Sequence, residues 1–157
     1  MNAEPITGGC QCGAVRFRAE GFGRASICHC RMCQKAFGNF VGPLVTALGL
    51  IWTRGEPKYF ASSDKVKRGF CANCGTPLTF EYGGDPEVAI GALDDPEGAA
   101  PVIQLNPKNK LSFFDTLAAL PMRGPQDEPK IEAFKASLTN LQHPDHDTAE
   151  WPPKTAR

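Results

Sequence analysis

The sequence predicts a mainly β protein with a single domain and one short helix near the carboxy terminus. Two observations carry this prediction: short apolar runs alternate with turn residues along most of the chain, and helical spacing occurs in only two places. A third observation, seven cysteines in three tight groups, suggests what holds such a domain together. At 157 residues the chain has room for one domain and a tail.

The first strand is predicted where Val15, Phe17 and Ala19 alternate with polar residues, the pattern of a strand with one buried face. Further runs of strand length follow, separated by turn residues such as those at 55–57, 83–86 and 94–96. These runs cover residues 40–46, 50–53, 58–61, 66–70, 78–82 and 88–93. The aromatic residues in and beside them can line a pocket, but the core is the favoured interpretation: Phe37, Phe40, Trp52, Phe60, Phe70 and Phe80.

The uncharged stretch at 36–53 is long enough to consider as a membrane span. Glycines and a proline interrupt it, which favours buried strands over a spanning helix. The amino terminus lacks the basic start and apolar run of a secretory signal, so we expect a cytoplasmic protein with no membrane partner. The 17 basic and 17 acidic residues leave zero net charge, which argues against a general nucleic-acid binder.

Two helices are predicted. One covers residues 30–37 and is ended by Gly38, and the other covers 128–141 with Asp127 as a possible cap. In the second helix four apolar residues recur at helical spacing: Ile131, Phe134, Leu138 and Leu141. Residues 142–157 hold three prolines among polar residues and are expected to form a loose tail, with His143 and His146 in solvent. The expected division is 1–124 for the cysteine-rich domain and 125–157 for the helix and flexible tail.

The cysteines fall into two pairs and one triple. The pairs are Cys10-Gln-Cys12 and Cys71-Ala-Asn-Cys74, each followed by a glycine that lets a tight turn close. Two such turns normally share one tetrahedral zinc ion, so the pairs predict a closed structural site. The triple, Cys28, Cys30 and Cys33, then has no further cysteine to close a fourth position, and such a three-ligand zinc ion is open for chemistry.

Other interpretations remain open from the spacing alone. The paired cysteines can form disulfides or stay as buried thiols, although an odd count in a reducing compartment weighs against disulfides. In the triple, Cys30 and Cys33 match a redox dithiol, and His29 can complete a closed metal site. A different partition, with Cys10, Cys12, Cys28 and Cys30 around one metal ion, is also compatible with the sequence.

The polar residues near the cysteines in the sequence each have two interpretations. His29 is either a proton shuttle at the triple or a packed residue. Arg31, Lys35 and Arg68 can meet a substrate carboxylate, but ordinary surface charge is the favoured interpretation.

Several motifs, in order, resemble the glutathione-dependent formaldehyde-activating enzyme (GFA) family, which is shared with centromere protein V relatives. The resemblance spans residues 7–121. It rests on the segments Gly9-Cys-Gln-Cys-Gly-Ala-Val-Arg-Phe17, Cys28-His-Cys-Arg-Met-Cys33, Gly55-Glu-Pro57, Arg68-Gly-Phe-Cys-Ala-Asn-Cys-Gly75 and Gly91-Ala-Leu-Asp-Asp-Pro96.

The resemblance implies an antiparallel fold called a β-tent, assembled around zinc. It also implies a structural zinc ion on Cys10, Cys12, Cys71 and Cys74 and a catalytic one on Cys28, Cys30 and Cys33, two per chain. The activity it implies is that of a carbon-sulfur lyase, S-(hydroxymethyl)glutathione synthase, which joins glutathione and formaldehyde. Many relatives carry a His-x-Trp segment where this chain has Ile103-Gln-Leu105. They also carry a Trp where this chain has Phe113-Phe-Asp115, whereas the Leu-Pro pair of the family is present as Leu120-Pro121. The alternative function is a zinc-stabilised binding module without turnover.

Overall fold

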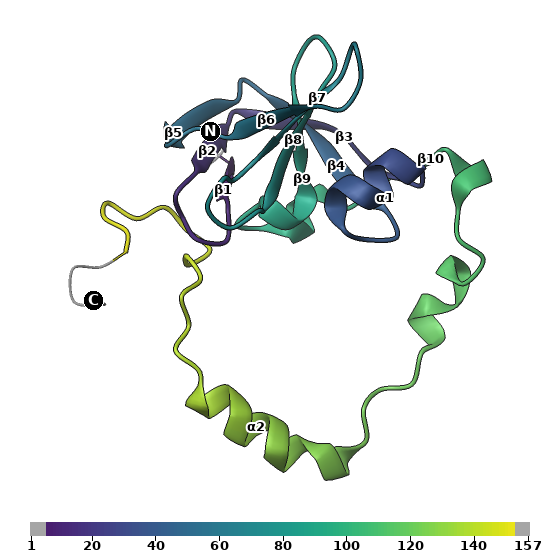
Figure 1. The fold of residues 1–157 in the computed structure, drawn as a ribbon, viewed down its shortest axis with the longest axis vertical. Helices are drawn as coiled ribbons and strands as arrows, with labels where there is room; N and C mark the ends of the chain where they lie inside the picture. The colour runs from purple at the N-terminus through teal and green to yellow at the C-terminus, as the bar shows by residue number, and fades with distance from the viewer. Residues whose placement is uncertain (1–5, 153–157) are drawn as a thin grey trace.

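The structure is a computed structural model that describes residues 6–152, and it confirms the mainly β architecture. Within this range the strands form a three-stranded sheet, β1-β2-β5, and a seven-stranded sheet, β10-β3-β4-β9-β8-β7-β6 (Figure 1). The strands are β1 (Ile6–Gly9), β2 (Arg16–Ala19), β3 (Gly21–Cys28), β4 (Gly42–Leu48), β5 (Ile51–Arg54), β6 (Lys58–Ala61), β7 (Lys67–Phe70), β8 (Pro77–Glu81), β9 (Glu87–Ala89) and β10 (Ile103–Leu105). The α-helices are α1 (Arg31–Phe37) and α2 (Glu128–Ser137).

Most neighbouring strands pair in the antiparallel direction expected from the resemblance. The exception within residues 6–152 is β10, which lies parallel to β3 and gives the larger sheet a mixed character. The chain reaches β10 from β9 through two 3₁₀ turns, Ile90–Ala92 and Pro96–Ala99. This pairing carries the chain past the end of β3, where the triple of cysteines begins.

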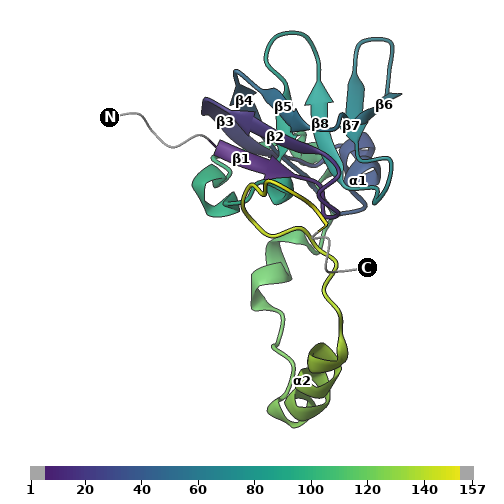
Figure 2. The same cartoon turned by 90° about the vertical axis from the view of Figure 1, so that its left-hand side faces the viewer.

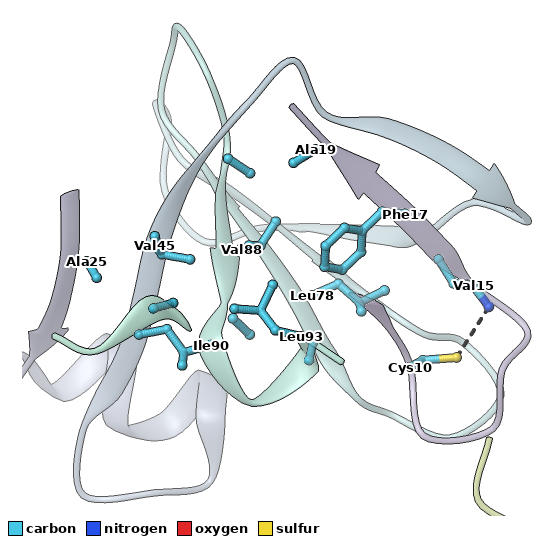
Figure 3. Packing of buried hydrophobic residues seen from close by; sticks show 14 of the residues in the cluster. Cys10, Val15, Phe17, Ala19, Ala25, Val45, Leu78, Val88, Ile90 and Leu93 are labelled. Carbon is cyan, nitrogen blue, oxygen red and sulfur yellow. Dashed lines mark hydrogen bonds between the residues drawn. The ribbon is translucent and has the colours of Figure 1, made fainter. Parts of the chain in front are cut away.

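The core lies between the two sheets. Phe17 of β2 packs among Leu78, Val88 and Leu93 from the larger sheet and the turn after β9 (Figure 3). Phe17, Leu78 and Val88 are fully buried, so the alternation that predicted β2 does mark its buried face. The core reaches Cys10 at the end of β1, which ties the first group of cysteines to the packed interior.

The predicted strands agree with the structure apart from small shifts at their ends. β6 has the predicted bounds, and the run at 88–93 divides into β9 and a 3₁₀ turn. Three strands were not predicted: β1, β3 and β10. β1 ends in two glycines, β10 has three residues, and β3 contains a bulge between Phe22 and Ala25 that interrupts its alternation.

The expectation that all the aromatic residues belong to the core is wrong for two of them. Phe60 is 64% exposed and Phe40 is 37% exposed, whereas Phe37 and Trp52 pack against the buried cluster. Phe60 lies on β6, an edge strand of the larger sheet whose four residues are all exposed.

The first helix begins and ends where predicted. Cys30 is the residue before α1, and its sulfur accepts a hydrogen bond from the Cys33 backbone N–H at 3.4 Å. Gly38 ends the helix with φ of 58°, a left-handed conformation that glycine adopts without strain.

The second helix is shorter than predicted and does not pack on the domain. It ends at Ser137, the Asp127 side chain makes no capping hydrogen bond, and Phe134 is 63% exposed. Figure 1 shows α2 at the far end of a long excursion that leaves the body after β10 and returns below β1. No helix in residues 6–152 combines the length and the apolar character that crossing a membrane requires.

The expected loose tail is wrong for residues 142–151, which we call the C-terminal clasp. Figure 2 shows this segment running directly below β1 and β2. The backbone N–H of His143 donates to the carbonyl of Gln11 at 2.8 Å, and the Trp151 indole N–H donates to the carbonyl of Cys12 at 2.8 Å. Asp147 forms an ion pair with the buried Arg16 at 2.7 Å. A proline-rich composition excludes regular secondary structure here, but it does not exclude packing.

Candidate metal centres

The structure gathers the seven cysteines into two groups of four and three. The sulfurs of Cys10, Cys12, Cys71 and Cys74 all lie within 4.8 Å of one another, as do those of Cys28, Cys30 and Cys33. We call these groups the first and the second cluster. The alternative partition, in which Cys10 and Cys12 share a metal ion with Cys28 and Cys30, is therefore not the arrangement of the fold.

The first cluster joins two tight turns that are distant in the sequence. Cys10 and Cys12 lie in the β1–β2 turn, and Cys71 and Cys74 lie in the β7–β8 turn. Gly13 and Gly75 have φ of 73° and 78°, as the glycine after each pair predicts, and the Gly75 N–H closes its turn on the Cys71 carbonyl.

The sulfur positions of the first cluster fit a zinc ion. The Cys10–Cys12 and Cys12–Cys71 sulfur separations are 3.6 Å and 3.8 Å. Four sulfurs at about 2.3 Å from a tetrahedral zinc ion lie about 3.8 Å apart. The Val15 backbone N–H donates to the Cys10 sulfur at 3.2 Å, which supports a thiolate at that position (Figure 3).

The thiols of the first cluster differ in acidity. Burial raises the pKa of the Cys12 thiol to about 12. Burial opposes ionisation of Cys74 too, but hydrogen bonds from Thr76 lower its pKa to about 6. A proton-bearing sulfur beside a thiolate is the arrangement that a bound divalent ion would convert into four thiolates.

The second cluster is assembled from the end of β3 and the start of α1. Cys28 is the last residue of β3, Cys30 caps α1, and Cys33 lies in its first turn. Cys28 and Cys33 are buried, whereas Cys30 is half-exposed. Among residues 6–152, no histidine nitrogen or carboxylate oxygen joins the three sulfurs within 4.8 Å. The arrangement therefore offers three protein ligands to a metal ion.

Two side chains that the sequence does not single out for this purpose contact the sulfurs of the second cluster. The Asn106 side-chain N–H donates to the Cys28 sulfur at 3.2 Å, and Asn106 adopts a left-handed backbone conformation to do so, with φ of 55°. An Arg68 N–H donates to the Cys33 sulfur at 3.4 Å. Asn106 follows β10, so only the unpredicted β3–β10 pairing reveals its proximity to Cys28.

The favoured interpretation of Arg68 as surface charge is wrong, because its side chain is only 8% exposed. Its guanidinium donates to Ser62 at 3.1 Å and lies over the ring of Phe80. No carboxylate of residues 6–152 forms an ion pair with it. A buried cation is stabilised by an anion beside it, and the Cys33 sulfur would supply one in its thiolate form.

The thiols of the second cluster differ in acidity. Burial raises the pKa of the Cys33 thiol to about 12, against the hydrogen bond from Arg68, which lowers it. Burial also opposes ionisation of Cys30, yet hydrogen bonds from Cys33 and Cys28 bring its pKa below the ordinary value. Three thiolates this close together would repel one another, and a bound divalent cation would offset that repulsion.

His29 lies inside the protein and away from the three sulfurs. It is fully buried, its Nε2 lies 2.9 Å from the Gln104 side-chain oxygen, and its ring packs edge-on against Phe114. Among residues 6–152, its Nδ1 finds no hydrogen-bond partner. These contacts favour a packing role; a proton-transfer role stays a prediction.

The remaining candidate residues divide by exposure. Arg31 and Lys35 are exposed on α1, as expected for surface charge. His146 is exposed, as expected. The expectation for His143 is wrong, because the clasp buries it to 4% exposure beside Trp151.

Comparisons with known proteins identify the family. The sequence profile of the family described as "Glutathione-dependent formaldehyde-activating enzyme" matches residues 5–109, about two thirds of the chain. Among solved structures, the chain is similar to a protein from Rhodobacter sphaeroides at 25% identity, with a TM-score of 0.49, over 62% of this chain and 98% of that one. A comparison with curated proteins finds no match. The matched residues include both cysteine clusters, and the chain therefore belongs to the glutathione-dependent formaldehyde-activating enzyme family.

Proposed function

We propose that this protein is a zinc-dependent carbon-sulfur lyase that forms or cleaves the adduct of a small thiol and a small aldehyde. Glutathione and formaldehyde, which give S-(hydroxymethyl)glutathione, are the pair that the family description suggests. The observation that carries the proposal is the second cluster, in which three cysteine sulfurs converge without a fourth protein ligand among residues 6–152.

One cluster would hold a structural zinc ion and the other a catalytic one. Cys10, Cys12, Cys71 and Cys74 would hold a zinc ion with all four positions closed, which fastens the β1–β2 turn to the β7–β8 turn. Cys28, Cys30 and Cys33 would hold a second ion with one position left for a substrate. Zinc in such a site supplies a place where an added thiol loses its proton near neutral pH and is held as a thiolate.

The residues around the second cluster suit this chemistry. The Arg68 guanidinium offsets part of the negative charge of three thiolates, and Asn106 fixes the direction of the Cys28 sulfur. In the forward reaction the thiol sulfur forms a bond to the carbonyl carbon, and the proton lost by the thiol ends on the carbonyl oxygen. The reverse reaction breaks the same bond and returns thiol and aldehyde, so no oxidant or reductant is needed.

The proposal is tested by following glutathione and formaldehyde with exchange NMR in the presence of the zinc-loaded protein. We expect adduct formation faster than the uncatalysed rate, and we expect Cys33→Ser to return it to that rate while the β fold remains. Cys71→Ser is the contrasting variant, because loss of the closed site is expected to unfold the domain. A rate equal to the uncatalysed one with both zinc ions bound would contradict the lyase proposal and favour a binding module on the same scaffold.

A further inference from the structure

Beside the second cluster lies a hollow whose walls are mainly apolar, and the proposed chemistry does not by itself explain it. It has a volume of about 330 Å³ and lies between α1 and strands β6, β7 and β8. Its lining includes Ala36, Phe37, Phe60, Arg68, Phe70 and Thr79. Three phenyl rings from three different elements thus converge on one space large enough for a small ring or a short alkyl chain.

The hollow adjoins the second cluster through two elements. On α1, Cys33, Ala36 and Phe37 are three and four residues apart, so they share a face of the helix. On β7, Arg68 lines the hollow and also donates to the Cys33 sulfur at 3.4 Å. A molecule in the hollow that touches Arg68 is therefore separated from the second cluster by one side chain.

The polar groups of the hollow are few and already engaged. The Thr79 hydroxyl donates to Glu81 at 2.9 Å and accepts from the Gly69 N–H at 3.1 Å. Arg68 is more than nine-tenths buried and bonds Ser62 and Cys33. An occupant therefore gains from apolar contact with the rings and meets a single fixed positive charge at the end nearest the cluster.

We propose that this hollow binds the apolar substituent of the thiol substrate, an aryl or branched alkyl group whose sulfur reaches the second cluster. This inference rests on the proposed function, because it takes the second cluster as the place where the thiol reacts. It narrows the substrate class to thiols that carry one compact apolar group close to the sulfur. The polar arms of a peptide thiol gain nothing from these walls, so such a thiol would bind the second cluster with those arms outside the hollow.

The test compares two thiols that differ in the apolar group. We would add (4-fluorophenyl)methanethiol and ethanethiol to the zinc-loaded full chain, following the first by fluorine NMR and the second by its competition. The aromatic thiol is expected to bind at least about tenfold tighter, because its ring buries additional apolar surface. Equal affinities would overturn the proposal.

Two variants of α1 show whether the hollow is responsible. Ala36 is exposed at the mouth of the hollow, so Ala36→Phe fills it without disturbing the core, and the preference for the aromatic thiol should fall to within about twofold. Met32→Phe enlarges an exposed residue of the same helix outside the hollow and should keep the preference. An unchanged preference in Ala36→Phe would contradict the assignment.

The experiments distinguish a failure of the proposed substrate class from a failure of the proposed lyase function. If neither thiol binds, the proposed function is wrong in its use of the second cluster. Binding of (4-fluorophenyl)methanol, which does not need a zinc ligand position, then tests whether the hollow accepts an aromatic ring. Binding of this alcohol that Ala36→Phe removes supports the hollow, and no binding overturns it. If the glutathione adduct forms but the aromatic thiol has no advantage, the lyase proposal stands and the substrate class is wrong.

Discussion

At the scale of single residues, the positive charge of Arg68 beside the Cys33 sulfur is expected to strengthen zinc binding at the second cluster. Arg68→Met keeps the volume of the side chain but removes the cation that contacts the Cys33 sulfur. We expect the affinity of the second site for zinc to fall by about 10- to 100-fold, as loss of partners around metal ligands commonly does. Competition with a chromogenic chelator measures this loss.

Arg68→Lys is the matched control, because it keeps the charge and loses the fixed geometry. It should retain part of the affinity, while the first site holds its zinc ion in both variants. Equal affinities in Arg68→Met and the unmodified protein would show that the guanidinium only fills space.

Two glycines at equivalent places in the first cluster make a second comparison at this scale. Both have positive φ, so Gly75→Ala is expected to destabilise the zinc-loaded protein by about 1–2 kcal/mol through backbone strain alone. A Cβ at Gly75 meets no other atom within 4 Å, whereas one at Gly13 collides with the rings of His143 and Trp151. Gly13→Ala should therefore cost about 2–5 kcal/mol.

Urea unfolding at a fixed zinc concentration measures both glycine variants. If Gly13→Ala and Gly75→Ala lose similar amounts of stability, the clasp accommodates the added methyl group and does not stabilise the first cluster.

At the scale of elements, the clasp is expected to stabilise the β1–β2 turn. Trp151→Ala removes the donor to the Cys12 carbonyl and uncovers the buried His143 ring, so we expect a loss of about 2–3 kcal/mol and faster release of zinc from the first site. Phe134→Ala in α2 removes a similar aromatic side chain that is 63% exposed, and it should change stability by less than about 0.5 kcal/mol.

Thermal unfolding and the rate of zinc transfer to a chelator report on these two variants. If Phe134→Ala lowers the stability as much as Trp151→Ala does, then α2 packs on the body in solution and the clasp is not the element that stabilises the β1–β2 turn.

Sequence reasoning predicts elements whose signals are local. The alternation of Val15, Phe17 and Ala19 marks β2, and Gly38 ends α1, because each pattern reflects the conformation of its own segment. The closeness of the two cysteines within each pair also follows from local turns, since Gly13 and Gly75 close them, whereas the choice of pairs that share a site does not. The seven thiol positions are thus the most predictable part of the candidate site.

The surroundings of the site are not predictable in the same way. Asn106 reaches Cys28 because β10 pairs with β3, a contact between residues 78 positions apart. Arg68 is buried because neighbouring strands and α1 cover it, although arginine in a polar segment is ordinarily exposed. Burial of the clasp depends on ion pairs and hydrogen bonds to Arg16, Gln11 and Cys12, none of which composition reveals.

At the scale of the whole molecule, the functions proposed for the two clusters separate stability from chemistry. The first cluster lies where the core, two turns and the clasp meet, so its metal ion would hold the sheets together. The second lies where β3 ends and α1 begins, and its three cysteines come from one short segment, with Arg68 and Asn106 beside them. We therefore expect removal of the second metal ion to leave the fold intact and removal of the first to unfold it.

We expect the second cluster to take a substrate thiol as its fourth ligand, and X-ray absorption at the zinc edge counts the sulfur atoms bound to each zinc ion. With two zinc ions shared by seven cysteines, the mean number of sulfur neighbours should be about 3.5 per zinc ion. After addition of a thiol substrate it should rise to about 4, and in Cys33→Ser it should not rise. A mean that stays at about 3.5 when the thiol is added would contradict the account.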